Sequence, residues 1–181
     1  MQEHKVVVLG PMGAGKSTLV QTLAQGTAIV TEARNTDPAA AKEFTTVALD
    51  SADIRLPGGD RLRLYGTPGQ ARFAFLWPIL LKGARGAIVL VDASAGDAHD
   101  DALHHLQAIH RCNPTLPLVI GITRCDATSA FMRDTCDAWL QRHAPTLPAI
   151  PLDPRSPRQV ITLMDVLMSQ IECQALVHAD E

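Results

Sequence analysis

The chain has 181 residues, of which 46% are hydrophobic, and is long enough to bury the core of one domain, which we expect to span residues 1–181. Its formal net charge of −3 and its lack of a Lys and Arg cluster argue against a nucleic-acid partner, because binding to a phosphate backbone needs concentrated positive charge. No apolar run approaches the roughly 18 residues of a membrane span, and the last residues contain no prenylation cysteine, so we expect no direct membrane anchor.

The first predicted elements are a short strand and the loop that follows it. Val6–Leu9 is an apolar run typical of a buried strand, and residues 10–17 fit G-x-x-x-x-G-K-[ST], a phosphate-binding loop, before a predicted helix over Thr18–Gln25. Glycines let backbone N–H groups surround phosphate oxygens, and the helix N-terminus adds about half a positive charge. We expect Lys16 to reach the outer phosphates and the Ser17 hydroxyl to bind magnesium. The candidate nucleotide-binding residues here are Gly10, Met12, Gly13, Ala14, Gly15, Lys16, Ser17 and Thr18.

The next part of the chain predicts a long loop and a hairpin. Gly26–Thr45 has no sustained hydrophobic period, and a loop of this length is uncommon in a compact domain unless it is functional. Thr46–Leu56 and Arg61–Tyr65 are predicted strands on either side of a Pro57–Asp60 turn. The spacing therefore predicts an antiparallel pair.

Strands and helices alternate through the rest of the chain. The predicted elements are a helix over Ala71–Lys82 with a kink at Pro78, a strand over Gly86–Asp92, a helix over Ala98–Arg111, a strand over Leu118–Thr123, a helix over Thr128–His143, a weak strand over Ala149–Leu152 and a helix from Ser156 to about Ala175. This alternation predicts an α/β fold, in which helices cover both faces of a mostly parallel sheet.

From its first strand to its last helix, the chain resembles a small GTPase of the Ras superfamily. It is most similar to bacterial Ras-like proteins that are often encoded beside roadblock-type regulators. The resemblance is carried by the phosphate-binding loop, by Gly69–Phe73, by Trp77-Pro78 and by Gly83–Ala87. It implies a three-layer P-loop NTPase G domain, with a sheet of about six mostly parallel strands and one antiparallel strand. GTP or GDP with Mg²⁺ are the implied ligands.

Two further stretches resemble the switch segments of this family. Thr46 stands where the family has a threonine that binds magnesium and the γ-phosphate, although a β-branched residue also simply starts strands. The stretch GTPGQ that begins at Gly66 is similar to D-x-x-G-Q, with Gly69 donating to the γ-phosphate and Gln70 orienting water; the plain alternative is a turn. Gly66 replaces an aspartate that holds magnesium through a water. This departure either weakens metal binding or leaves the task to another carboxylate, such as Asp92.

The stretch TRCD, from Thr123 to Asp126, stands where the family has N-K-x-D, which reads the base. The Asp126 carboxylate would accept hydrogen bonds from guanine N1–H and the 2-amino group, a pair of donors that adenine lacks; a helix cap is the alternative. Arg124 would stack along the base, and Thr123 lacks the carboxamide that braces the phosphate-binding loop. A fainter match to the family's S-A-K box consists of Asp153, Pro154 and Arg155.

The candidate catalytic residues are Gln70, Lys16, Arg34 and Arg72. Met12 occupies a position that is glycine in Ras, where side-chain bulk obstructs an arginine supplied by a partner. Arg34 or Arg72 could instead supply that charge from within the chain, which is worth about 10³ to 10⁵ in rate, whereas the plain alternative is a solvated side chain.

We expect a guanine-nucleotide switch that slowly hydrolyses GTP and controls a protein partner through residues 31–46 and 66–76. The alternative is a nucleotide-bound interaction protein that scarcely hydrolyses GTP, motivated by Gly66, Met12 and Thr123. An ATP-dependent kinase is a third reading, without an identifiable acceptor site or lid. The expected partners are a roadblock-type regulator or activating protein and an effector, and pairing of two subunits stays open. Four cysteines without C-x-x-C spacing and no signal peptide favour reduced thiols and the cytoplasm.

Overall fold

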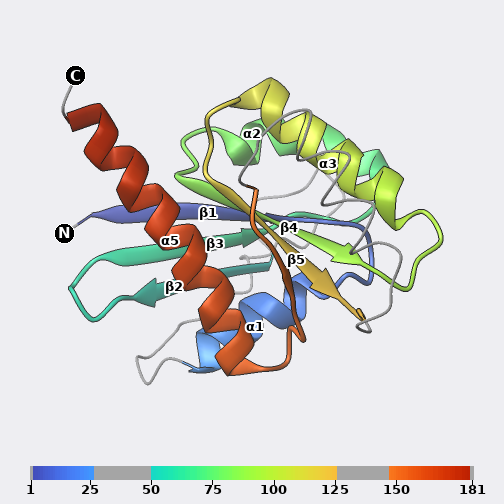
Figure 1. The fold of residues 1–181 in the computed structure, drawn as a ribbon, viewed down its shortest axis with the longest axis horizontal. Helices are drawn as coiled ribbons and strands as arrows, with labels where there is room; N and C mark the ends of the chain where they lie inside the picture. Colours follow the sequence, from blue (N-terminus) through green and yellow to red (C-terminus); the bar gives the residue numbers. More distant parts are fainter. Residues whose placement is uncertain (1, 27–49, 126–146, 180–181) are drawn as a thin grey trace, which may run out of the picture.

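The computed structural model describes residues 2–26, 50–125 and 147–179, in which six strands form one sheet. The strands are β1 (Glu3–Leu9), β2 (Asp50–Arg55), β3 (Arg61–Gly66), β4 (Gly86–Asp92), β5 (Leu118–Thr123) and β6 (Ala149–Pro151), in the order β2-β3-β1-β4-β5-β6 (Figure 1). The β2–β3 pair is antiparallel and the other pairs are parallel. The predicted sheet, including its single antiparallel strand, is confirmed.

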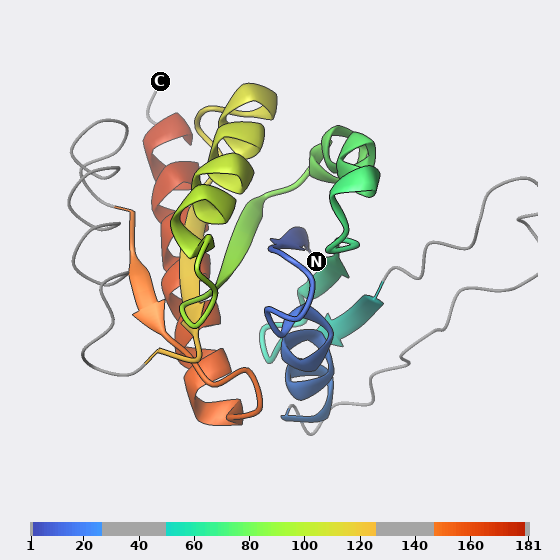
Figure 2. The same cartoon turned by 90° about the vertical axis from the view of Figure 1, so that its right-hand side faces the viewer.

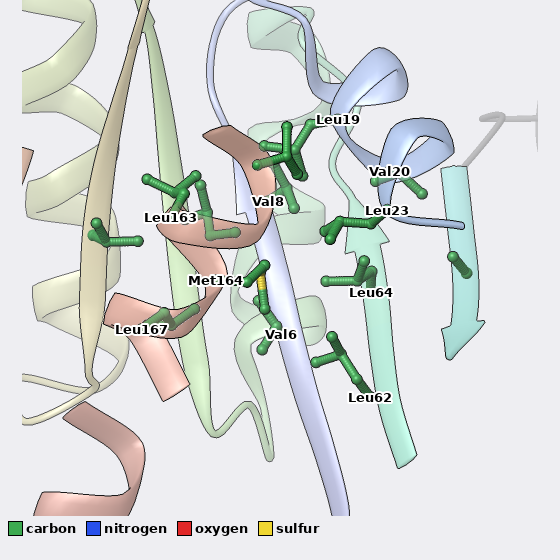
Figure 3. Packing of buried hydrophobic residues seen from close by; sticks show 14 of the residues in the cluster. Val6, Val8, Leu19, Val20, Leu23, Leu62, Leu64, Leu163, Met164 and Leu167 are labelled. Carbon is green, nitrogen blue, oxygen red and sulfur yellow. The ribbon is translucent and has the colours of Figure 1, made fainter. Parts of the chain in front are cut away.

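The described helices cover both faces of this sheet. They are α1 (Lys16–Gly26), the 3₁₀ helix η2 (Ala71–Leu76), α2 (Trp77–Leu81), α3 (Ala98–Cys112) and α5 (Pro157–Ala179). Alternate residues of β1 separate the two cores, because successive side chains of a strand point to opposite faces. Val6 and Val8 pack with α1 and α5 (Figure 3), whereas Val7 and Leu9 pack in the core that includes α2 and α3. Figure 2 shows the resulting three layers, as predicted.

Several element boundaries differ from the prediction. Helix α1 begins at Lys16 rather than Thr18, because the phosphate-binding loop turns directly into the helix. The segment 71–82 is not one helix kinked at Pro78: a 3₁₀ helix ends at Leu76 and α2 begins at Trp77. Proline is tolerated there because the first turn of a helix does not need its N–H. The predicted loop 26–45 and the predicted helix 128–143 lie outside the described residues, apart from Gly26.

The expectation that no apolar run reaches the length of a membrane span is wrong for α5. Residues 157–177 are long enough and apolar enough to cross a membrane by length and composition, with a mean hydropathy of 1.4. One face of the helix, formed by Val160, Leu163, Leu167 and Ile171, is buried in the core, and Figure 3 shows Leu163 and Leu167 of this face. A Cβ on Gly86 of β4 would lie 2.9 Å from Ile171 Cδ1, which shows how closely α5 approaches the sheet. In this fold α5 therefore packs one face against the core, with 28% of this apolar stretch buried.

Candidate functional site

The loop between β1 and α1 has the glycine conformations that its motif predicts. Gly10, Gly13 and Gly15 have φ angles of 146°, 84° and 97°, in the region that side chains rarely adopt. A Cβ on Gly10 would lie 2.4 Å from the Leu90 carbonyl oxygen of β4. The loop is thus seated at the carboxyl edge of the parallel strands, where α/β proteins bind their ligands.

Lys16 lies across this loop. Its ammonium group donates hydrogen bonds to the Gly10 carbonyl oxygen at 2.8 Å and to the Pro11 carbonyl oxygen at 2.6 Å, and its side chain is buried. Burial lowers the pKa of Lys16 from 10.5 to about 8, and the charge of Asp50 opposes that shift. An anion bound beside this ammonium group would favour its charged form and raise that pKa.

This pKa predicts how nucleotide binding depends on pH. Below about pH 8 the ligand-free Lys16 is already charged, whereas above it binding must take up a proton, so affinity falls by up to about tenfold per pH unit. Calorimetry of GDP binding between pH 7 and 9.5, in buffers of different ionisation enthalpy, measures this uptake. Lys5→Met is the control and keeps the dependence, because Lys5 bonds to the Lys82 carbonyl oxygen instead. A flat pH profile would contradict the assignment.

A carboxylate that the sequence analysis missed lies beside Ser17. The Ser17 hydroxyl donates a hydrogen bond to Asp50 Oδ2, and Asp50 is paired with Gly66 across β2 and β3. A Cβ on Gly66 would lie 3.3 Å from Asp50 Cβ, so the space next to Gly66 is already taken by this aspartate. The predicted hairpin could have revealed this pairing, because residues 50 and 66 are equally far in sequence from Gly58 in the turn and therefore face each other across the two strands.

Asp92, the carboxylate suggested from the sequence, is engaged elsewhere. Its Oδ1 accepts hydrogen bonds from the Ser94 amide at 3.0 Å and the Ser94 hydroxyl at 2.6 Å, and its Oδ2 pairs with Arg124. Burial raises the pKa of Asp92, but the Ser94 hydrogen bonds and the Arg124 charge outweigh it and hold that pKa below its usual value. Asp50, rather than Asp92, is the carboxylate in contact with Ser17.

The stretch that begins at Gly66 returns to the phosphate-binding loop. Thr67 is buried, and its amide and hydroxyl both donate to the Val8 carbonyl oxygen, at 2.8 and 3.1 Å. A Cβ on Gly69 would lie 2.6 Å from the Met12 nitrogen and 2.7 Å from Lys16 Nζ. Only glycine fits at position 69. The Thr67 hydrogen bonds therefore anchor the segment to β1, and Gly69 lies in close contact with the phosphate-binding loop.

The catalytic candidates near this stretch lie at the surface. Gln70 is exposed immediately before η2, and the Arg72 guanidinium lies 4.8 Å from the centroid of the neighbouring Phe73 ring. Met12 is 73% exposed at the tip of the phosphate-binding loop. The structure thus places Gln70 and Arg72 on the same short segment as Gly69. Arg34 and Thr46 lie outside the described residues.

A cavity of about 530 Å³ opens on the other side of the loop. It is lined by residues 13–15, 122–125 and 151–155, together with Thr18 and Gln159. The Thr123 hydroxyl lies 3.2 Å from the Ala14 carbonyl oxygen and 3.1 Å from the Val91 carbonyl oxygen. The brace on the phosphate-binding loop is therefore kept by a hydroxyl, which corrects the expectation that it is lost with the family's carboxamide.

Arg124 and the loop after β6 form further walls of this cavity. Arg124 has a positive φ of 51°, and its guanidinium pairs with Asp92 and donates to the Gly13 carbonyl oxygen at 3.1 Å. A Cβ on Gly15 would lie 2.7 Å from Pro154 Cγ, so the two loops touch. Asp153 and Arg155 form an exposed ion pair at 2.9 Å. Asp126, the predicted base-reading residue, lies outside the described residues.

The chain is similar in sequence to known proteins. A sequence model of the Ras family matches residues 5–146. Ras-related protein RHN1 of Nicotiana plumbaginifolia is 29% identical over 67% of this chain and 58% of its own length, and Ras-related protein Rab-5A of Dictyostelium discoideum is 25% identical over 75% and 64%. An uncharacterised protein of Methanocaldococcus jannaschii is 34% identical over 55% of this chain and 57% of its own length. The chain spans less than two thirds of each of these relatives.

Proposed function

Because the chain belongs to the Ras family, we propose that it is a molecular switch that binds GTP and GDP with magnesium and slowly hydrolyses GTP. The observation that carries the proposal is the convergence of Lys16, Ser17 and Gly69 on the phosphate-binding loop. A terminal phosphate placed there would meet the Lys16 ammonium group and the Gly69 amide together. Its loss on hydrolysis would release the segment that begins at Gly66.

Ser17 and Asp50 fit a magnesium ion. A hydroxyl and a carboxylate in mutual contact are the hard oxygen groups that Mg²⁺ prefers, and phosphate oxygens and waters commonly complete its octahedral shell. When bound, the ion would offset the charge of the triphosphate. Asp50 would hold it from the strand opposite Gly66, either directly or through a water, and thereby take over the role of the missing aspartate.

The hydrolysis step separates the switch from the alternative, an interaction protein that scarcely hydrolyses GTP. If Gln70 orients the attacking water, Gln70→Leu lowers the single-turnover rate by at least about tenfold and leaves GTP affinity unchanged. Gln107→Leu, at an exposed position of α3, is the matched control. The rate is measured with and without a roadblock-type candidate. A wild-type rate no faster than that of Gln70→Leu, with the candidate present, would favour the interaction protein.

The proposal also covers protein partners, pairing of subunits and cellular location. An effector would contact the exposed apolar side chains of the segment that follows Gly69, which include Phe75 at 61% and Ile79 at 64% exposure, and the exposed Met12 of the loop that Gly69 approaches. A roadblock-type regulator would act on the same segment, in the cytoplasm. Sedimentation of the protein with GDP and with a non-hydrolysable GTP analogue tests whether two subunits pair only in the triphosphate state.

A further inference from the structure

The loop after β6 uses its backbone donors within the protein. The Leu152 amide donates to the Ile122 carbonyl oxygen at 2.8 Å, and Pro154 has no N–H group to donate. The Arg155 amide donates to Asp153 Oδ1 at 3.0 Å, and the Arg155 side chain also binds that carboxylate. A hydrogen bond from this wall of the cavity to an acceptor atom on a base must therefore come from a side chain.

Gln159, in the first turns of α5, supplies such a donor. The Asp153 amide donates to Gln159 Oε1 at 2.6 Å, and Gln159 lines the cavity. An amide N–H can donate only to an oxygen here, so this contact fixes which end of the Gln159 carboxamide is the NH₂ group. Among the described residues that NH₂ group has no hydrogen-bond partner.

Two neighbouring residues of the cavity, Thr123 and Arg124, already use side-chain donors within the protein. The single hydroxyl proton of Thr123 is shared between the Ala14 and Val91 carbonyl oxygens, and the Arg124 guanidinium donates to Asp92 and to the Gly13 carbonyl oxygen. Gln159 thus contributes a fixed donor that is free for a ligand. A 6-oxopurine carries an acceptor oxygen at position 6, whereas adenine carries an amino donor there.

We propose that Gln159 is a specificity-determining residue that donates a hydrogen bond to the carbonyl oxygen of a guanine base. The inference rests on the proposed function, because it assumes that a purine nucleotide occupies this cavity. Adenine would require the carboxamide to turn around, and turning it would break the hydrogen bond from Asp153. The discrimination is built into the contact between Gln159 and Asp153.

The test compares GDP and ADP binding, by calorimetry with magnesium, in two variants. Gln159→Glu keeps an acceptor for the Asp153 amide but replaces the NH₂ donor by a second acceptor, so GDP affinity falls by at least about tenfold and ADP affinity rises. Gln159→Met lowers GDP affinity and leaves ADP affinity unchanged. Gln174→Glu adds the same charge to the far part of α5, where Gln174 bonds to the Thr115 carbonyl oxygen, and keeps the wild-type preference.

The outcomes separate the two claims. A wild-type protein that prefers GDP, with both Gln159 variants retaining that preference within about twofold, would overturn the role of Gln159 and leave the proposed function standing. A wild-type protein without any preference for GDP would overturn the proposed function and this inference together. Gln159 is exposed, so neither variant disturbs the core, and an unchanged melting temperature verifies this.

Discussion

Asp50→Asn is expected to weaken GDP binding by about 100-fold in magnesium while leaving the affinity in EDTA nearly unchanged. The reason is that Asp50 is the carboxylate in contact with Ser17, and asparagine cannot offer the same negative charge to a divalent cation. The measurement is GDP affinity at a series of free magnesium concentrations. Asp53→Asn, on the same strand, is the control, because within the described part of the chain Asp53 forms only exposed ion pairs, with Arg61 and Arg63.

An exchange of the two paired residues sharpens this test. Residues 50 and 66 face each other across β2 and β3, so the double variant Asp50→Gly with Gly66→Asp moves the carboxylate to the neighbouring strand. The exchange is expected to restore most of the magnesium dependence that Asp50→Gly alone loses. If Asp50→Asn binds GDP with wild-type magnesium dependence, Asp50 is not part of the metal site.

The second large effect is expected at Asp126. Its carboxylate is predicted to accept hydrogen bonds from guanine N1–H and the 2-amino group, so Asp126→Asn is expected to lower GDP affinity by about 10³-fold or more. Xanthine carries an oxygen in place of the 2-amino group, and the amide of the variant can donate to it. Xanthosine diphosphate should therefore bind Asp126→Asn more tightly than it binds the wild type.

A competition assay with labelled GDP measures both affinities. Asp100→Asn, which removes an exposed carboxylate of α3, is the control and leaves both affinities unchanged. An Asp126→Asn variant that keeps its preference for GDP would show that another group reads the base. Because the effect at Gln159 concerns position 6 of the ring, the Asp126 and Gln159 variants report on different edges of guanine.

The parts of the site that lie within one short stretch could be predicted from the sequence. The phosphate-binding loop is one: its glycines need unusual φ angles and close approaches, as at Gly10 against Leu90, so its residue pattern and its structure are tightly linked. The apolar run Val6–Leu9 likewise predicted a buried strand, which the structure buries on both faces, and the other strands were predicted from their own apolar or alternating patterns.

The parts that depend on contacts between distant segments could not be predicted in the same way. Asp50 looks like an ordinary strand residue until the hairpin register places it opposite Gly66 and beside Ser17. Thr123 appeared to lack a bracing group because its hydroxyl reaches Ala14 only after β5 and the loop have folded together. The predicted helix over 71–82 with a kink at Pro78 is instead a 3₁₀ helix followed by α2, because local propensity does not reveal where a 3₁₀ turn gives way to an α-helix.

Calorimetric titration of the wild-type protein with GDP, GTP and ATP, each with magnesium and with EDTA, tests the central claim most directly. The account predicts that GDP and GTP bind, that magnesium strengthens both, and that ATP fails to displace labelled GDP. Binding of ATP as tight as that of GTP, or guanine-nucleotide binding that is indifferent to magnesium, would contradict it.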